Sequence, residues 1–227
     1  MNEKQWDSIA DKYFNEIESP FSSETNHEIF KKIGKGKSVI DLGTGIGNLI
    51  PFLSQNFKNV VAVDFSEGML NKAKEKNKDN VKFYIRNLNN LKGFYEKFDV
   101  AIAINSIIMP SLIDINKTFN EIYKVLKKGG KFIGVFPSLD SDIYRAMLTF
   151  ETELNETKSE AKAKKNTKYI MCNDNYDWIF GIYNNKGRQK HYFKEELSHR
   201  LKNFKKIKIE KLHYEENNWD WLVTAEK

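Results

Sequence analysis

Short apolar runs alternate with helix-like patterns along most of the chain. The runs are residues 37–42, 59–64, 81–86, 98–104 and 130–136. They are apolar almost throughout, which is typical of strands buried on both faces. Between the last two runs, apolar residues recur at helical spacing: Leu112, Ile115, Phe119, Ile122, Tyr123 and Leu126. We therefore expect a parallel sheet wrapped by crossover helices, with the helix over 112–126 closed by Lys127, Lys128 and the Gly129-Gly130 pair.

The pattern changes in the last third of the chain. Residues 205–216 and 218–227 alternate apolar and polar positions with almost no connection between them, which predicts an antiparallel pair of strands. Residues 137–193 fit neither pattern. They begin with a polar helix predicted over about 140–163, and Asn184 to Gly187 has the composition of a hairpin turn. We interpret this region as an insertion over the carboxyl edge of the sheet.

Length and composition favour one domain covering residues 1–227. A chain of 227 residues and 26.6 kDa with 40% hydrophobic residues supports one sizeable core. The longest apolar stretch, 100–113, is too short and too interrupted to span a bilayer. Cys172 is the single cysteine, so no internal disulfide can form. We expect a protein that is not exported and not membrane-bound, cytoplasmic, and monomeric or weakly dimeric.

The net charge of +6 is spread along the chain. Residues 151–227 hold 16 Lys and Arg and 13 Asp and Glu, net +3, which leaves +3 for residues 1–150. Only small basic clusters occur, at 162–165 and between Arg200 and Lys211. We interpret both as solvated surfaces, and RNA contact remains the alternative. No spacing of His, Cys and Asp resembles a metal site.

The stretch VIDLGTGIGNL, residues 39–49, places three glycines at alternate positions after an apolar run. Glycine lets a backbone approach a ligand closely, and open α/β sheets bind ligands beyond the carboxyl ends of their strands. The dinucleotide pattern G-x-G-x-x-G would need glycine where the chain has Asn48, and the Lys-Ser/Thr of a phosphate-binding loop is missing. Asp64 follows Gly43 by 21 residues at the end of the second run, where a carboxylate can bind both hydroxyls of a ribose. The alternative is that Asp64 caps the helix that begins near Ser66.

Five ordered motifs resemble the class I S-adenosylmethionine-dependent methyltransferases, and specifically the small Rossmann-like members of that family. The motifs are VIDLGTGIGNL, VVAVDFSEGML, FDVAIAINSIIM, VLKKGGKFIGVF and HYFKEELSHRLKNF. The resemblance covers nearly the whole chain except about 138–190. It implies an α/β fold: a doubly wound, seven-stranded sheet, mostly parallel with an antiparallel last strand and helices on both faces. It also implies S-adenosyl-L-methionine as the cofactor.

The same resemblance implies a set of cofactor-binding residues. Asp41, Gly43, Gly45 and Gly47, with Thr44 between them, would follow the methionine part, and Asp64 would bind the ribose. Phe65 and Met69 would flank the adenine. Asn87 stands where the family usually has an aspartate that accepts from the adenine amino group, and Leu88 would offer its backbone N–H to the ring. Asn105 and Ser106 would lie near the methyl group, and Tyr13 would belong to N-terminal helices, residues 1–35, that cap the cofactor.

Two motifs that the chain lacks narrow the choice of methyl acceptor. Asn105-Ser106-Ile107-Ile108 is not the Asn/Asp-Pro-Pro-aromatic sequence of enzymes that methylate amino groups of bases, and Cys172 stands outside any Pro-Cys motif. We expect a small-molecule acceptor, with RNA or protein as an alternative acceptor and a non-catalytic cofactor-binding protein as a further alternative. No catalytic residue is assigned, although His191 and Tyr192 are candidate general bases. The aromatic residues of the insertion, 138–190, suggest a lid that carries specificity.

Overall fold

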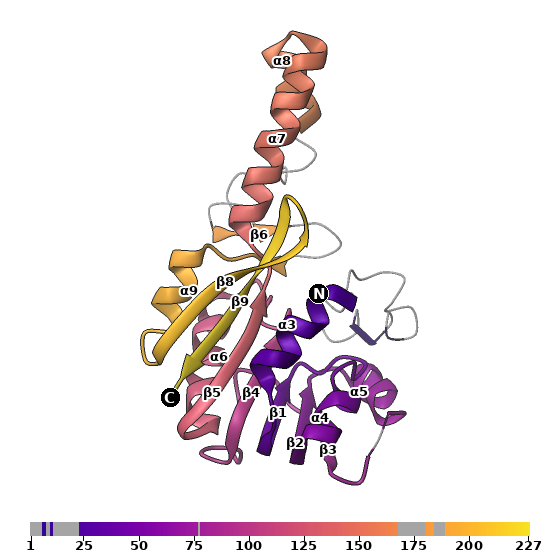
Figure 1. Ribbon diagram of the computed structural model, residues 1–227, viewed down its shortest axis with the longest axis vertical. Helices are drawn as coiled ribbons and strands as arrows, with labels where there is room; N and C mark the ends of the chain where they lie inside the picture. Colours follow the sequence, from indigo (N-terminus) through magenta and orange to yellow (C-terminus); the bar gives the residue numbers. More distant parts are fainter. Residues whose placement is uncertain (1–5, 8–9, 11–22, 77, 168–179, 184–188) are drawn as a thin grey trace.

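The structure is a computed structural model that describes residues 6, 7, 10, 23–76, 78–167, 180–183 and 189–227. A seven-stranded sheet forms its body (Figure 1). The strands are β1 (Gly36–Leu42), β2 (Phe57–Asp64), β3 (Val81–Ile85), β4 (Phe98–Ile104), β5 (Leu126–Phe136), β8 (Lys205–Glu215) and β9 (Asn218–Glu226). Their spatial order is β3-β2-β1-β4-β5-β9-β8.

Strand direction in the sheet is as predicted. The pairs β3–β2, β2–β1, β1–β4 and β4–β5 are parallel, whereas β9 runs antiparallel to both β5 and β8. Placing β9 between β5 and β8 keeps the connection from β8 to β9 short, because a tight turn can join only antiparallel strands. The predicted doubly wound α/β sheet with an antiparallel last strand is confirmed.

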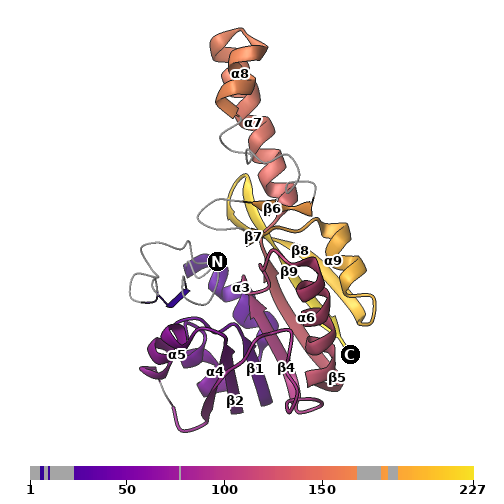
Figure 2. The same cartoon turned by 180° about the vertical axis from the view of Figure 1, so that it is seen from behind.

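Helices cover both faces of the sheet (Figures 1 and 2). On one face α6 (Leu112–Val125) and α9 (Lys194–Arg200) pack against inward side chains of β4, β5 and β9. On the other face α3 (Ser23–Ile33) and α4 (Ile50–Asn56) pack on the alternate residues of β1, β2 and β4. α5 (Glu67–Lys74) lies beside β2 and β3. Both faces of the central strands are therefore buried, which explains their nearly continuous apolar sequence.

The junction between α6 and β5 corrects one prediction. The helix ends at Val125, and Leu126 is already extended, fully buried and paired with Phe98 on β4. Gly129 adopts a left-handed conformation, φ 77°, and its N–H donates to the carbonyl of Lys227. The glycine pair therefore lies within an irregular start of β5 and does not close the helix.

The region after β5 forms an arm of two helices, α7 (Leu139–Thr157) and α8 (Glu160–Thr167), which extends away from the sheet (Figures 1 and 2). The single polar helix expected here is interrupted at Lys158, whose left-handed backbone (φ 50°) reverses the chain. β6 (Ile182–Tyr183) and β7 (Gln189–Lys190) then pair antiparallel. The hairpin turn predicted between them lies outside the described residues.

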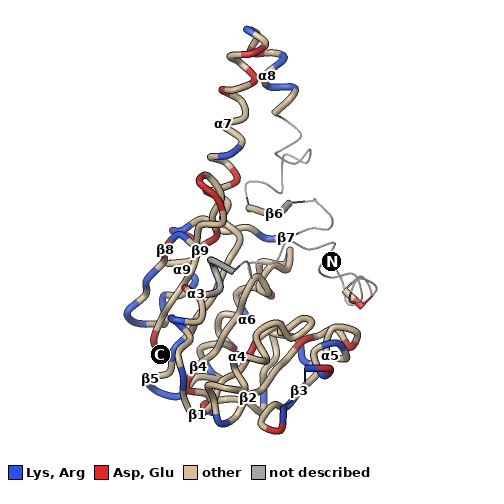
Figure 3. The backbone as a smooth tube through the Cα atoms, turned by 45° about the vertical axis from the view of Figure 1, so that its right-hand side comes forward, with Lys and Arg blue, Asp and Glu red and all other residues tan. Residues whose placement is uncertain are grey.

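Basic and acidic residues are both scattered along the backbone (Figure 3). The most basic stretch lies within β8, an edge strand of the sheet. Its exposed lysines are Lys205, Lys206, Lys208 and Lys211. Lysines along an edge discourage pairing with another strand. Within the described ranges, no helix combines the length and apolar character needed to cross a bilayer.

Candidate functional site

The three glycines of the turn between β1 and α4 serve two purposes. All three glycines have left-handed backbones, with φ of 74°, 53° and 76° for Gly43, Gly45 and Gly47. A Cβ on Gly43 would lie 2.4 Å from the Cβ of Ser106, and one on Gly47 would lie 2.9 Å from the Cβ of Ala73. A Cβ on Gly45 would meet nothing within 4 Å. Gly43 and Gly47 thus allow neighbouring protein segments to approach, while Gly45 faces open space.

Asp64 ends β2 and fastens the turn. One carboxylate oxygen accepts from the N–H of Gly45 at 2.9 Å, and the other accepts from the N–H of Ser66 at 3.0 Å. The cap of α5 is Ser66 itself, whose hydroxyl accepts from the N–H of Met69. Asp64 therefore is not the helix cap, and its side chain forms part of the pocket wall.

Two buried carboxyl groups lie under this turn. Burial, opposed by a hydrogen bond from the Thr44 hydroxyl and assisted by the charge of Asp64, raises the pKa of Asp41 to about 7. Burial likewise raises the pKa of Asp64, opposed by the N–H groups of Ser66, Gly45 and Phe65. Two acids that resist ionisation together provide an environment in which a positive charge is stabilised.

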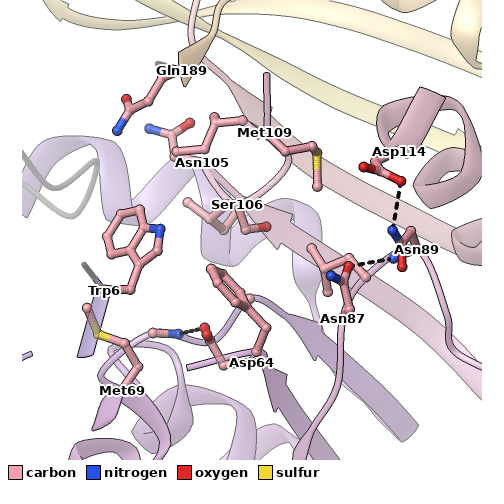
Figure 4. A pocket seen from close by; sticks show the side chains of 16 residues that line it. Trp6, Asp64, Met69, Asn87, Asn89, Asn105, Ser106, Met109, Asp114 and Gln189 are labelled. Atoms are coloured by element: carbon pink, nitrogen blue, oxygen red, sulfur yellow. Dashed lines mark hydrogen bonds between the residues drawn. The ribbon is translucent and has the colours of Figure 1, made fainter. Parts of the chain in front are cut away.

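The turn opens into a pocket of about 1050 Å³, measured with its open mouth (Figure 4). Nine predicted cofactor-binding residues line it: Gly43, Gly45, Asp64, Phe65, Met69, Asn87, Leu88, Asn105 and Ser106. Asp41, Thr44 and Gly47 are not among the lining residues, and Tyr13 lies outside the described residues. Sequence reasoning missed the remaining lining residues: Trp6, Asn89, Ile104, Ile108, Met109, Asp114 and Gln189.

The N-terminal segment is held against this pocket. The Asp7 carboxylate accepts from the hydroxyl of Ser66 at 2.5 Å and from the N–H of Gly68 at 3.0 Å, both at the start of α5. Trp6, next to it in the chain, lines the pocket. The expected cap rested on Tyr13, which lies outside the described residues; Trp6 is a described N-terminal residue that lines the pocket.

Asn105 and Ser106, after β4, form the wall opposite Asp64. The Ser106 hydroxyl donates to the carbonyl of Leu42 at 2.6 Å. Asn105 has a left-handed backbone, φ 46°, and its amide donates to the Asp220 carboxylate at 3.1 Å. The Tyr214 hydroxyl donates to the same oxygen at 2.7 Å, and burial raises the pKa of Asp220. A buried network from β8 and β9 thus holds this wall.

The candidate general bases are not in the pocket wall. Tyr192 is fully buried, packs edge-on against Phe136, and donates its hydroxyl to the carbonyl of Ile107 at 2.6 Å. Burial raises its pKa well above the usual value, and Tyr192 is not among the lining residues, so its role as a base stays a prediction without support from this geometry. The Nδ1 of His191 lies 2.7 Å from the Asp142 carboxylate, and His191 is not among the lining residues. Over the described part of the chain, no cluster of three or more His, Cys, Asp or Glu side chains could hold a metal ion.

Comparison with known proteins shows which proteins this site resembles. A family model described as a methyltransferase domain matches residues 39–130, from the glycine turn to the start of β5. The ubiquinone/menaquinone biosynthesis C-methyltransferase UbiE of Rickettsia typhi is 30% identical over 156 residues, which are 57% of this chain. The chain spans about 60% of the length of that relative.

Two solved structures share the fold. The N-methyltransferase NodS of Bradyrhizobium japonicum, in complex with S-adenosyl-L-homocysteine, superposes with a TM-score of 0.69 at 9% identity, covering 99% of this chain and 97% of that one. The 1,6-didemethyltoxoflavin-N1-methyltransferase of Burkholderia thailandensis superposes with a TM-score of 0.58 at 16% identity, covering 90% and 77%. Residues 39–130 thus match a methyltransferase domain, and the chain has the fold of solved S-adenosylmethionine-dependent methyltransferases.

Proposed function

We propose that the protein is an S-adenosylmethionine-dependent methyltransferase that acts on a small molecule. The observation that carries the proposal is the convergence of the glycine turn, Asp64 and the Asn87-Leu88 segment on one pocket. These segments follow β1, β2 and β3, which are adjacent and parallel, so their carboxyl ends meet at one edge of the sheet. Open α/β sheets bind nucleotide-like ligands at this edge.

The pocket's residues fit a positively charged nucleoside. Each carboxylate oxygen of Asp64 accepts a backbone N–H through one lone pair, which leaves lone pairs for ribose hydroxyls. Gly45 leaves its backbone accessible to a ligand. The raised pKa values of Asp41 and Asp64 mean that a nearby cation would stabilise their ionised forms. Phe65 and Met69 supply apolar surface for a flat ring.

Bound S-adenosylmethionine would supply an already activated methyl group, so the chain's task is to hold the acceptor in line and exclude water. Trp6, Ile108 and Met109 offer apolar contact, and the amides of Asn105 and Gln189 offer hydrogen bonds. No Lys, Arg, His or Tyr occurs among the lining residues that the structure describes. We therefore assign these apolar and amide side chains of the described wall to positioning of the acceptor.

A small-molecule acceptor is supported by the relatives. The UbiE of Rickettsia typhi is named for quinone biosynthesis, and the Burkholderia thailandensis structure contains bound 1,6-didemethyltoxoflavin. The exposed lysines of β8 are the feature that keeps RNA as the alternative acceptor.

The test begins with calorimetry of S-adenosylmethionine, S-adenosylhomocysteine and NAD⁺. The first two are expected to bind, and NAD⁺ is not; binding of NAD⁺ alone would refute the assignment. Radiolabelled methyl donor is then offered with panels of quinones and heterocycles, of structured RNA, and of protein. Label in a small molecule supports the proposal. Label in RNA that falls steeply with salt would favour the alternative acceptor, and cofactor binding without transfer to any panel would favour the non-catalytic alternative.

A further inference from the structure

One end of the pocket carries a chain of three polar side chains that ends on a carboxylate (Figure 4). The side-chain oxygen of Asn87 accepts from the backbone N–H of Asn89 at 3.2 Å. The side-chain nitrogen of Asn89 donates to Oδ1 of Asp114 at 2.9 Å. All three residues line the pocket. The order of these bonds fixes which atoms at this end remain for a ligand.

Asn87 is a weaker acceptor than the aspartate that the family usually has at its position. Its uncharged amide oxygen already accepts from the N–H of Asn89 at one lone pair, and its NH₂ can only donate. Asp114 has the complementary property. Only Oδ1 is engaged, and within the residues that the structure describes Oδ2 accepts no hydrogen bond. The charged acceptor at this end of the pocket is therefore Asp114.

Asp114 is held in place from two sides. It lies in the first turn of α6, where its backbone N–H donates to the hydroxyl of the capping residue Ser111 at 3.2 Å. The positive end of the helix dipole favours its charge at this position. The amide of Asn89, from the loop after β3, fixes one carboxylate oxygen and so directs the other. A half-buried carboxylate with a fixed orientation is suited to recognising one donor group of a ligand.

We propose that Asp114, oriented by Asn89, selects a base that carries an exocyclic amino group by accepting a hydrogen bond from it. The resemblance assigns this acceptor role to Asn87. This inference rests on the proposed function, because it takes the ligand's base to lie at the Asn87-Leu88 end. The edge of adenine has an acceptor nitrogen beside the donor amino group. The 6-oxo base hypoxanthine has the reverse arrangement, so a fixed carboxylate accepts a hydrogen bond from adenine and repels the oxo group.

The experiment measures the affinities of S-adenosylhomocysteine and its deaminated analogue S-inosylhomocysteine by calorimetry, each on the same protein sample. The wild-type protein is expected to prefer the adenine compound by about tenfold or more. Asp114→Asn should reduce this ratio to within about threefold, because the new amide keeps its bond with Asn89 yet can also donate to an oxo group. Asn89→Ala should reduce the ratio part of the way.

Two further variants separate recognition from general effects. Glu67→Gln removes an exposed acid from the first turn of α5, away from the pocket wall, and should leave the ratio unchanged. Asn87→Ala should lower both affinities together and keep the ratio. A wild-type ratio near one, an unchanged ratio in Asp114→Asn, or loss of the ratio in Asn87→Ala would overturn the inference while cofactor binding stands. Failure of the wild-type protein to bind either compound would instead overturn the proposed function.

Discussion

Replacing Asp41 by asparagine should make the ligand-free protein more stable at alkaline pH. The Asp41 side chain is buried and its pKa rises to about 7, from 3.8. A group whose pKa is raised in the folded state favours folding while it is protonated. That advantage is lost as pH rises from the unfolded-state pKa to the folded-state pKa. At pH 8 the folded protein therefore bears a cost of about 4 kcal/mol, from about 3 units at 1.36 kcal/mol each.

The substitution removes this titration and keeps the local contact. The amide oxygen that Asp41→Asn introduces can still accept the Thr44 hydroxyl, which donates to the Asp41 carboxyl at 2.6 Å. Urea unfolding at pH 5 and pH 8 provides the measurement. The free energy of unfolding of the variant, relative to wild type, should rise by about 2–3 kcal/mol between the two pH values.

Asp99 on β4 provides a control of opposite sign. Burial raises its pKa, but hydrogen bonds from Lys127 and Ser38 outweigh burial and leave the pKa lowered. A group whose pKa is lowered in the folded state stabilises the fold at pH values above its unfolded-state pKa, and this stabilisation is lost as pH falls. Asp99→Asn should therefore be less stable than wild type at pH 8. The reasoning about the buried pair is wrong if Asp41→Asn is less stable than wild type at pH 8. It is also wrong if the free energy of unfolding differs from that of wild type by the same amount at both pH values.

The remaining predictions concern packing and the arm. Gly43→Ala should cost about 2–4 kcal/mol, because its Cβ would meet Ser106 and its φ of 74° is unfavourable; Ser106→Gly should restore part of the loss in thermal melts, and no restoration would contradict the clash. Tyr192→Phe should cost about 1–3 kcal/mol by leaving the carbonyl of Ile107 unpaired, with turnover within about threefold; a hundredfold loss of turnover at unchanged stability would return Tyr192 to the chemistry. Replacing residues 148–180 by a Gly/Ser loop should abolish methyl transfer and leave cofactor affinity within about tenfold, and retained turnover would show that the arm does not carry specificity.

The sheet could be predicted because its signal is local and repeated. Each central strand is apolar on both faces, and the structure buries both faces under helices. The two turns that were predicted wrongly depend on single residues. Lys158 adopts a left-handed backbone without being glycine, and the buried side chain of Leu126 draws the chain into β5 before the glycine pair. Neither effect leaves a periodic trace in the sequence.

The candidate site divides in the same way. Gly43, Gly45 and Asp64 were predictable because their spacing follows from one strand–turn–helix–strand unit. Trp6 and Asp114 were not, since they reach the pocket from segments far along the chain. The expectation for Tyr192 has a third origin. A tyrosine near a site is a candidate base in sequence, whereas its complete burial and the hydrogen bond from its hydroxyl to a backbone carbonyl become visible only in the structure.

The base of the arm constrains how the proposed lid could move. Leu139, Ser141 and Ala146 of α7 are buried, and the hydroxyl of Ser141 accepts from the N–H of Trp219 on β9 at 3.1 Å. The next residue of β9 is Asp220, which binds Asn105 in the pocket wall. The first turns of α7 and the pocket wall are thus hydrogen-bonded to adjacent residues of β9. These turns cannot shift without breaking buried hydrogen bonds, and each such bond costs about 1–3 kcal/mol when it is left unmade. Beyond Ala146 the described arm packs mainly on itself, so any closing motion must bend α7 outside its buried turns.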